Sequence, residues 1–179
     1  MRKIVAALLM LTSSFAFADA IPTNKHTGPY AELNVGSNLY YLGVFSSENK
    51  THGAGLRGYG WNAVVGYGFS PTFGLEGGWM QNYVNVDHGT HHLNVPFVTT
   101  RFTVPLGDRF SFIAKLGLTA PSVPEATKTK KPFVILPYTG IGLGYAMTQN
   151  LDVNVQYQGA VYGIAGAGLA SVGVTYHFD

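Results

Sequence analysis

The chain has 179 residues, of which only 11% are charged, and it contains no cysteine. The absence of cysteine excludes disulfide frameworks, thiol nucleophiles and cysteine-ligated metal sites. Two of the eleven basic residues, Arg2 and Lys3, lie at the extreme N-terminus, so the rest of the chain is close to neutral. Nucleic-acid binding would require a basic stripe on the folded domain, and we do not expect it.

The first residues are typical of an export signal. Arg2 and Lys3 precede an apolar run, residues 4–11, that is too short to cross a bilayer, and small residues follow at Ala16 and Ala18. This order predicts a secretory signal peptide over residues 1–18, with cleavage after Ala18 preferred over cleavage after Ala20. Residues 19–27 would then form a short N-terminal segment, and residues 28–179 a single domain.

From Gly28 onward the apolar residues alternate with small or polar ones, which is the period of a β-strand. The clearest case is the last segment, where Val172 and Val174 alternate with Ser171 and Gly173. Proline cannot donate to a strand ladder, so prolines in these segments are expected near strand ends. The prolines concerned are Pro96, Pro105 and Pro137. In chain order the pattern predicts eight strands, at residues 28–36, 61–69, 73–80, 94–106, 110–119, 136–147, 151–158 and 171–178.

The connections between these strands alternate in length. Tight turns are predicted at residues 70–72, 107–109 and 148–150, and long loops at residues 37–59, 82–93, 120–133 and 159–165. Short turns at one end and long loops at the other are typical of outer-membrane barrels, in which the turns are periplasmic and the loops extracellular. The predicted fold class is therefore all-β, an eight-stranded antiparallel up-and-down transmembrane β-barrel.

The two faces of the predicted strands differ in a way that indicates which face is inside. Soluble barrels such as lipocalins have an apolar interior, whereas here the polar face is too small and too charged to form a soluble core. Aromatic residues also gather beside the predicted turns, as in the aromatic girdles of membrane barrels. Because an isolated buried charge is costly, we expect the acidic residues of the lumen to share its basic ones. This predicted lumen charge network consists of Glu32, Glu76, Arg101, Lys115 and Asp152.

Residues 172–178 end in alternating apolar positions and an aromatic residue, and residues 28–36 begin the domain with a similar pattern. Both segments resemble strands of the OmpA-like and OmpX-like eight-stranded outer-membrane barrels, in the transmembrane domain only, so no peptidoglycan-binding domain is expected. The resemblance implies location in the outer membrane of a Gram-negative bacterium, in contact with its lipids and lipopolysaccharide. It also implies that periplasmic chaperones escort the chain and that the barrel-assembly machinery reads Val174, Tyr176 and Phe178, although Asp179 extends one residue beyond the usual terminal aromatic.

For a barrel of this kind, the expected function is structural or exerted through surface loops, as adhesion, envelope integrity or a narrow pore. The third long loop carries a basic patch, which could contact lipopolysaccharide phosphates or an acidic host surface. This patch consists of Lys128, Lys130 and Lys131. We predict neither catalytic residues nor a cofactor.

Two alternative functions remain open. Some small outer-membrane barrels modify lipid A with a serine, a histidine and an acid, but Ser46, Ser47 and His52 form no recognisable triad. A soluble exported lipocalin-like ligand binder would show the same alternation with its faces reversed. A surface cluster of histidines is usually solvated, so we predict no metal site at His88, His91 and His92.

Overall fold

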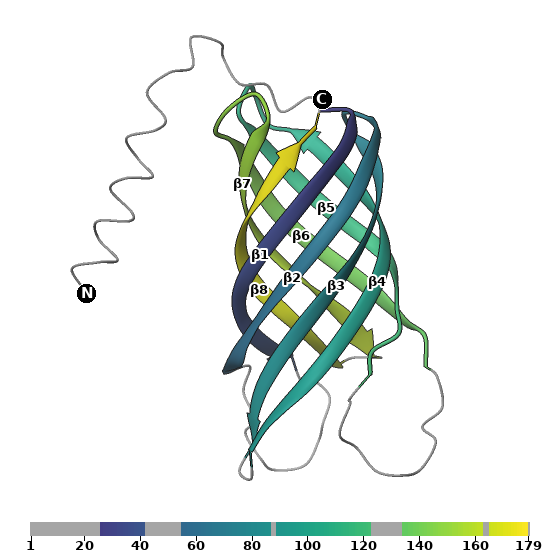
Figure 1. Ribbon diagram of the computed structural model, residues 1–179, viewed down its shortest axis with the longest axis vertical. Helices are drawn as coiled ribbons and strands as arrows, with labels where there is room; N and C mark the ends of the chain where they lie inside the picture. Colours follow the sequence, from purple (N-terminus) through teal and green to yellow (C-terminus); the bar gives the residue numbers. More distant parts are fainter. Residues whose placement is uncertain (1–25, 42–54, 87–88, 123–133, 163–164, 179) are drawn as a thin grey trace, which may run out of the picture.

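The computed structural model describes residues 26–41, 55–86, 89–122, 134–162 and 165–178. These residues form a closed barrel of eight strands (Figure 1). No helix among them is long and apolar enough to cross a membrane. The strands are β1 (Gly28–Tyr41), β2 (Gly55–Ser70), β3 (Phe73–Val86), β4 (Gly89–Pro105), β5 (Phe110–Thr119), β6 (Leu136–Ala146), β7 (Leu151–Tyr162) and β8 (Ala165–His177).

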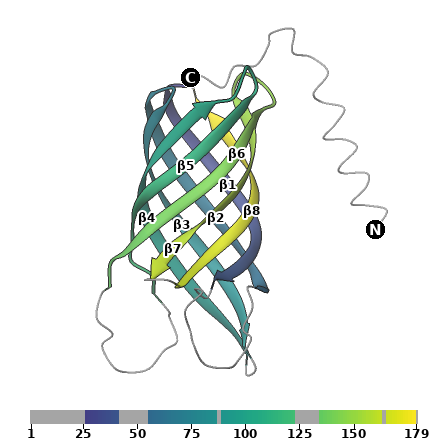
Figure 2. The same ribbon diagram turned by 180° about the vertical axis from the view of Figure 1, so that it is seen from behind.

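Every strand pairs antiparallel with its neighbour in sequence, and pairing of β1 with β8 closes the barrel (Figures 1 and 2). At this closure Leu33 of β1 lies opposite Val174 of β8, while on the other side of β1 it lies opposite Ala63 of β2. A bilayer offers no hydrogen-bond partners to a free strand edge, so a spanning sheet has to close in this way. The predicted fold class and topology are confirmed.

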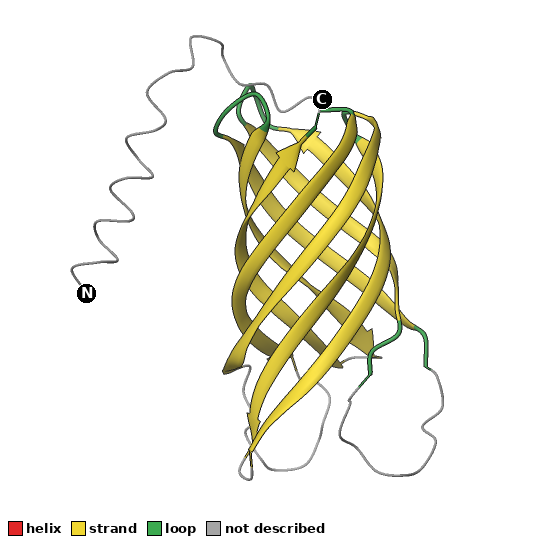
Figure 3. Cartoon of the chain, in the orientation of Figure 1, coloured by secondary structure: helices red, strands yellow, loops and turns green. Residues whose placement is uncertain are grey.

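The three tight turns lie together at one end of the barrel, where the C-terminus also lies (Figure 3). In the first turn the hydroxyl oxygen of Ser70 accepts hydrogen bonds from the backbone N–H groups of Thr72, at 3.3 Å, and Phe73, at 3.1 Å. Thr148 accepts in the same way in the third turn, and Gly107 adopts a φ of 106° in the second. All three turns were predicted at these positions, and by the rule for outer-membrane barrels this is the periplasmic end.

At the opposite end the strands are longer than predicted, and the predicted loops are correspondingly too long. β3 and β4 pair as far as Val86 opposite Gly89, so most of the predicted loop 82–93 is a hairpin. Likewise, β1 and β2 extend into the predicted loop 37–59, and β7 and β8 into 159–165. Beyond the hydrocarbon layer both faces of a strand meet water, so pairing continues without the apolar alternation on which the prediction depended.

Pro96 was expected near a strand end, but it lies well inside β4, opposite Trp79 of β3. Its carbonyl oxygen accepts from the Ala120 N–H, at 3.3 Å, on the side of β5. In an antiparallel strand the nitrogen and carbonyl of one residue point to the same side, so the missing donor faces the position where β5 has just ended at Thr119. The ladder between β3 and β4 therefore loses no hydrogen bond.

The two faces of the sheet divide as predicted. The outward face is a belt of exposed apolar side chains that runs around every strand, including Val98, Leu116, Ile141, Val155 and Val172, each more than half exposed. The inward face buries polar and charged side chains from all parts of the barrel, among them Asn34, Asn62, Asn154 and Gln158. This arrangement is the reverse of a soluble barrel and matches a transmembrane one.

Candidate functional site

Four charged side chains meet in the lumen, and we refer to Glu32, Glu76, Arg101 and Lys115 as the ion cluster. The Lys115 Nζ lies 2.9 Å from carboxylate oxygens of both Glu32 and Glu76. The Arg101 guanidinium lies 2.9 Å from Glu32 and 3.9 Å from Glu76. The side chains of Glu32, Glu76 and Lys115 have no solvent exposure. Two negative and two positive charges therefore balance one another away from water.

The carboxylate of Glu32 is further satisfied by amide donors. It accepts hydrogen bonds from Asn34 Nδ2, at 2.8 Å, and from Gln156 Nε2, at 3.0 Å. The Thr175 hydroxyl also donates to it, at 3.2 Å. A buried charge is tolerated when it is both paired and hydrogen-bonded. The period-two pattern had placed Asn34, Gln156 and Thr175 on the polar face, but it did not show that they converge on one carboxylate.

The Glu76 carboxylate has its own hydroxyl partners, Tyr30 and Thr99, which donate to it at 3.0 Å each. The Arg101 guanidinium also lies 5.1 Å above the ring of Tyr30, as a cation–π contact. Gly66 leaves space for Tyr30, because a Cβ at Gly66 would collide with the Tyr30 ring. This glycine in the lumen therefore makes room for an aromatic side chain.

An apolar layer fills the lumen beside the ion cluster. Phe97 and Tyr138 stack with ring centroids 4.4 Å apart and an interplanar angle of 10°. Along β4, Phe97 lies four residues from Arg101 in the direction of the loops, so this layer is on the loop side of the ion cluster. The apolar layer consists of Val64, Met80, Val95, Phe97, Tyr138 and Leu169, all buried.

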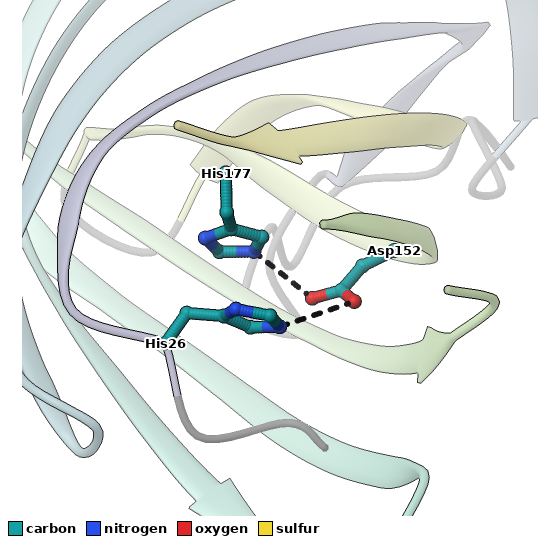
Figure 4. Close-up of side chains that lie close together, drawn as sticks. All are labelled: His26, Asp152 and His177. Atoms are coloured by element: carbon teal, nitrogen blue, oxygen red, sulfur yellow. Dashed lines mark hydrogen bonds and ion pairs between the residues drawn. The ribbon is translucent and has the colours of Figure 1, made fainter. Parts of the chain in front are cut away.

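Asp152 does not join the ion cluster, which departs from the prediction. It is the second residue of β7, near the periplasmic end, and its Oδ2 is 3.1 Å from His177 Nε2. Its Oδ1 is 3.8 Å from Nε2 of His26, two residues before β1 (Figure 4). The prediction was wrong on this pairing because it grouped the inward charges by face alone, although the predicted turn at residues 148–150 already placed Asp152 beside the turn end.

His26 was missed entirely by the sequence analysis, because it lies before the first strand and belongs to no alternating pattern. Its imidazole stacks on that of His177, with centroids 3.7 Å apart and an interplanar angle of 12°. We refer to His26, Asp152 and His177 as the mouth triad. A small cavity of about 30 Å³ opens beside it and is also lined by Tyr30, Ser111 and Arg101.

The three residues of the predicted assembly signal, Val174, Tyr176 and Phe178, have outward-facing side chains. The Tyr176 and Phe178 rings contact each other edge to face, with centroids 5.1 Å apart. The Phe178 N–H donates to the Pro29 carbonyl at 3.0 Å, which fixes the end of the chain to β1. Their role in assembly stays a prediction.

Several candidate residues lie outside the described part of the chain. They are Lys128, Lys130 and Lys131 of the basic patch, Ser46, Ser47 and His52 of the alternative that modifies lipid A, His88, and the predicted signal peptide 1–18. Of the other two loop histidines, His91 and His92 both fall in β4 rather than in a loop, and the His92 ring packs edge to face on Tyr83 at 4.8 Å.

Comparison with known proteins agrees with this geometry. An uncharacterised protein of Coxiella burnetii is 24% identical over 79% of this chain and 77% of its own length. Among solved structures, Neisserial surface protein A matches with a TM-score of 0.60 and 16% identity, over 86% of this chain and 99% of that one. The Ail protein of Yersinia pestis matches with a TM-score of 0.56 and 14% identity, over 86% of this chain and all of that one.

These structural likenesses concern the fold. The family described as outer membrane protein beta-barrel domain matches residues 4–178, nearly the whole chain. Proteins of this family lie in the outer membrane of Gram-negative bacteria, and the apolar belt and polar lumen of this barrel agree with that location. The chain belongs to the outer-membrane protein β-barrel domain family.

Proposed function

We propose that the protein is a sealed structural barrel that anchors its extracellular loops in the outer membrane. The observation that carries this proposal is the double filling of the lumen, by the balanced ion cluster and by the apolar layer next to it. A pore of eight strands has an interior just wide enough for side chains to fill, and here the four charges of the ion cluster pair with one another. The chemistry of the site favours stability over transport.

Conductance across a planar bilayer tests the sealed lumen. Purified wild-type barrel should give no steady single-channel steps, and Arg101→Ala should also remain silent because Phe97 and Tyr138 still fill the lumen. An outer-membrane channel of known conductance, inserted from the same detergent, is the positive control. Steady steps in the wild type whose size changes in Arg101→Ala would establish a narrow pore and overturn the proposal.

The loops are then the functional surface, and we infer that the basic patch binds a polyanion. Ail has been solved in complex with the heparin analogue sucrose octasulfate, on the same fold. The three closely spaced lysines of this chain could attract sulfated or phosphorylated groups, including those of neighbouring lipopolysaccharide, through charge. This inference concerns residues 128, 130 and 131, which lie outside the described segments.

Binding of whole cells or reconstituted vesicles to immobilised heparin tests the loop proposal. Replacement of all three lysines by glutamine should abolish salt-sensitive binding, because the attraction between exposed charges is screened by salt. Arg109→Gln removes a positive charge from the turn end instead and should leave binding unchanged. Equal binding by the triple variant and the wild type would exclude the basic patch as the contact surface.

We also infer that the protein has no enzymatic activity. Among the described residues, Asp152 contacts His177 at 3.1 Å and Ser111 lines the same small cavity, but this group lies at the turn end and not at the loop end, where lipid A is held. Ser46, Ser47 and His52 lie in residues 42–54, outside the described part. Mass spectrometry of lipid A from cells with and without the protein checks this inference. A change in lipid A that disappears with Ser46→Ala or Ser47→Ala would contradict it.

A further inference from the structure

The mouth triad brings together three ligand types from distant parts of the chain. His26 precedes the first strand, Asp152 belongs to β7 and His177 is the last residue of β8. One potential ligand atom from each of the three lies within 4.8 Å of the other two. Closure of the barrel creates this grouping, because β8 lies between β7 and β1 in the sheet.

We propose that the mouth triad is a binding site for a divalent transition metal ion, Zn²⁺ in the first instance. Two imidazoles and one carboxylate are a recurrent ligand set for zinc. With bonds of about 2.0–2.2 Å, the ligand atoms of a tetrahedral zinc site lie roughly 3.3 Å apart. His177 Nε2 lies 3.1 Å from Oδ2 of Asp152, and His26 Nε2 lies 3.8 Å from the other carboxylate oxygen, Oδ1. The carboxylate thus lies close to both imidazoles at about that spacing, and a small rotation would bring one oxygen between them.

The environment of the triad supports a metal ion. Its side chains are shielded, with exposures of 8% for each histidine and 11% for Asp152, so they are held by packing rather than free in water. The stacked imidazoles place both Nε2 atoms beside the same carboxylate (Figure 4). Because the two rings are nearly parallel, their Nε2 lone pairs do not converge, so at least one imidazole has to turn out of the stack to bind an ion shared with the other.

A fourth ligand has a place beside the triad. The adjoining cavity of about 30 Å³ is lined by all three residues and is large enough to hold one water molecule. Three protein ligands and one water complete the tetrahedron of an open zinc site. Arg101 also lines this cavity, but its guanidinium is engaged by Glu32 at 2.9 Å, so its charge is balanced within the ion cluster.

A bound ion would connect three segments at the seam where the barrel closes. It would join the residues before β1 to the end of β8 and to β7, next to the hydrogen bond between Phe178 and Pro29. The metal would thus secure the periplasmic end of the closing strand pair, a structural role that leaves the lumen unchanged.

Calorimetric titration of untagged, refolded barrel with Zn²⁺ after chelator treatment tests the proposal. The wild type should bind one equivalent. Loss of a residue that only orients a metal ligand already costs about ten- to hundredfold in affinity. Asp152→Asn and His26→Gln each remove a ligand and should therefore weaken binding at least about tenfold. Co²⁺ should give the visible absorption of a low-coordinate site in the wild type and lose it in both variants.

The matched control removes two histidines from the other end of the barrel. His91→Gln combined with His92→Gln, on β4, should leave Zn²⁺ binding unchanged. A heat-modifiable band on gels verifies that each variant has folded. The proposal is overturned if the folded wild type binds no Zn²⁺, or if folded Asp152→Asn and His26→Gln bind Zn²⁺ as tightly as the wild type, whatever the β4 double variant does.

Discussion

At the scale of single residues, Lys115 has the most demanding position in the barrel. Its ammonium group lies equally close, at 2.9 Å, to two carboxylates and has no contact with solvent. Removing one partner from a buried ion network leaves charge that nothing compensates, whereas removing one charge of each sign keeps the balance. Substitutions in the ion cluster can therefore test whether stability depends on the balance of its positive and negative charges, rather than on any one contact.

Lys115→Met is expected to lower the free energy of unfolding by about 3–5 kcal/mol, because Glu32 and Glu76 would then share only Arg101. Adding Glu76→Gln should restore part of the loss, since the amide can still contact Tyr30 and Thr99. Urea unfolding in lipid vesicles measures both variants. A single variant as stable as the wild type would show that the cluster contributes nothing to folding.

Gly78 is a second residue whose role can be isolated. A Cβ at this position would lie 2.5 Å from the Phe97 ring and 2.8 Å from the Ala63 carbonyl oxygen. Gly78→Ala should therefore destabilise the barrel by about 1–3 kcal/mol, the usual effect of overpacking. Gly77→Ala, whose Cβ would meet only one atom at 3.8 Å, is the control and should be close to neutral in the same unfolding assay.

Sequence predicted the residues of the lumen better than their partners. The alternation correctly placed Glu32, Glu76, Arg101 and Lys115 on the inner face, because a strand reverses its side chains at every residue. It could not give the stagger and tilt of the strands, which decide which inward side chains converge across the lumen. Asp152 was assigned to the ion cluster by face alone, although the predicted turn at residues 148–150 already placed it near that end, where it lies with His177.

At the scale of strands, hydrophobic alternation located the membrane-spanning parts and missed their extensions. The hairpin of β3 and β4 continues to Val86 and Gly89 although most residues of its outer part, 81–94, are polar. The bilayer imposes the apolar pattern, whereas backbone pairing alone maintains the strand beyond it. A hydrophobicity signal therefore reports the thickness of the membrane rather than the length of the strand.

The last strand allows an element-scale prediction. If the terminal aromatic is an assembly signal, Phe178→Ala should lower the fraction of protein that appears as a heat-modifiable band in the outer membrane of growing cells. Phe110→Ala, which removes a similarly exposed ring near the same end, should assemble normally. Both variants should refold alike in detergent, where no assembly machinery acts. Equal assembly of the two variants in cells would contradict the signal.

At the scale of the whole molecule, the apolar belt determines where the barrel resides. Leu116, in the middle of β5, and Val104, next to the turn end of β4, are both outward and more than half exposed. Charge on the lipid face is most costly at the bilayer midplane and nearly free at its edges. The cost of introducing a charge at each of these two positions therefore reports how deep that position lies in the bilayer.

Leu116→Arg should lower the free energy of unfolding in lipid vesicles by about 2–4 kcal/mol, and Val104→Arg by about 0–1 kcal/mol. Unfolding by denaturant, followed by tryptophan fluorescence, gives both values. Equal, small effects at the two positions would mean that the belt faces water, as in a soluble barrel with an exposed apolar surface.

The pairing of β1 with β8 has a consequence for the order of events during biogenesis. β1, the first of the eight strands to be synthesised, pairs with β8, the last of the eight, so the sheet keeps two unsatisfied edges until β8 has been translocated. No partial barrel can enter lipid with its backbone satisfied. The polypeptide therefore has to cross the periplasm in an incomplete form that is exposed to proteases and to aggregation, and every step that delays its last residues prolongs that exposure.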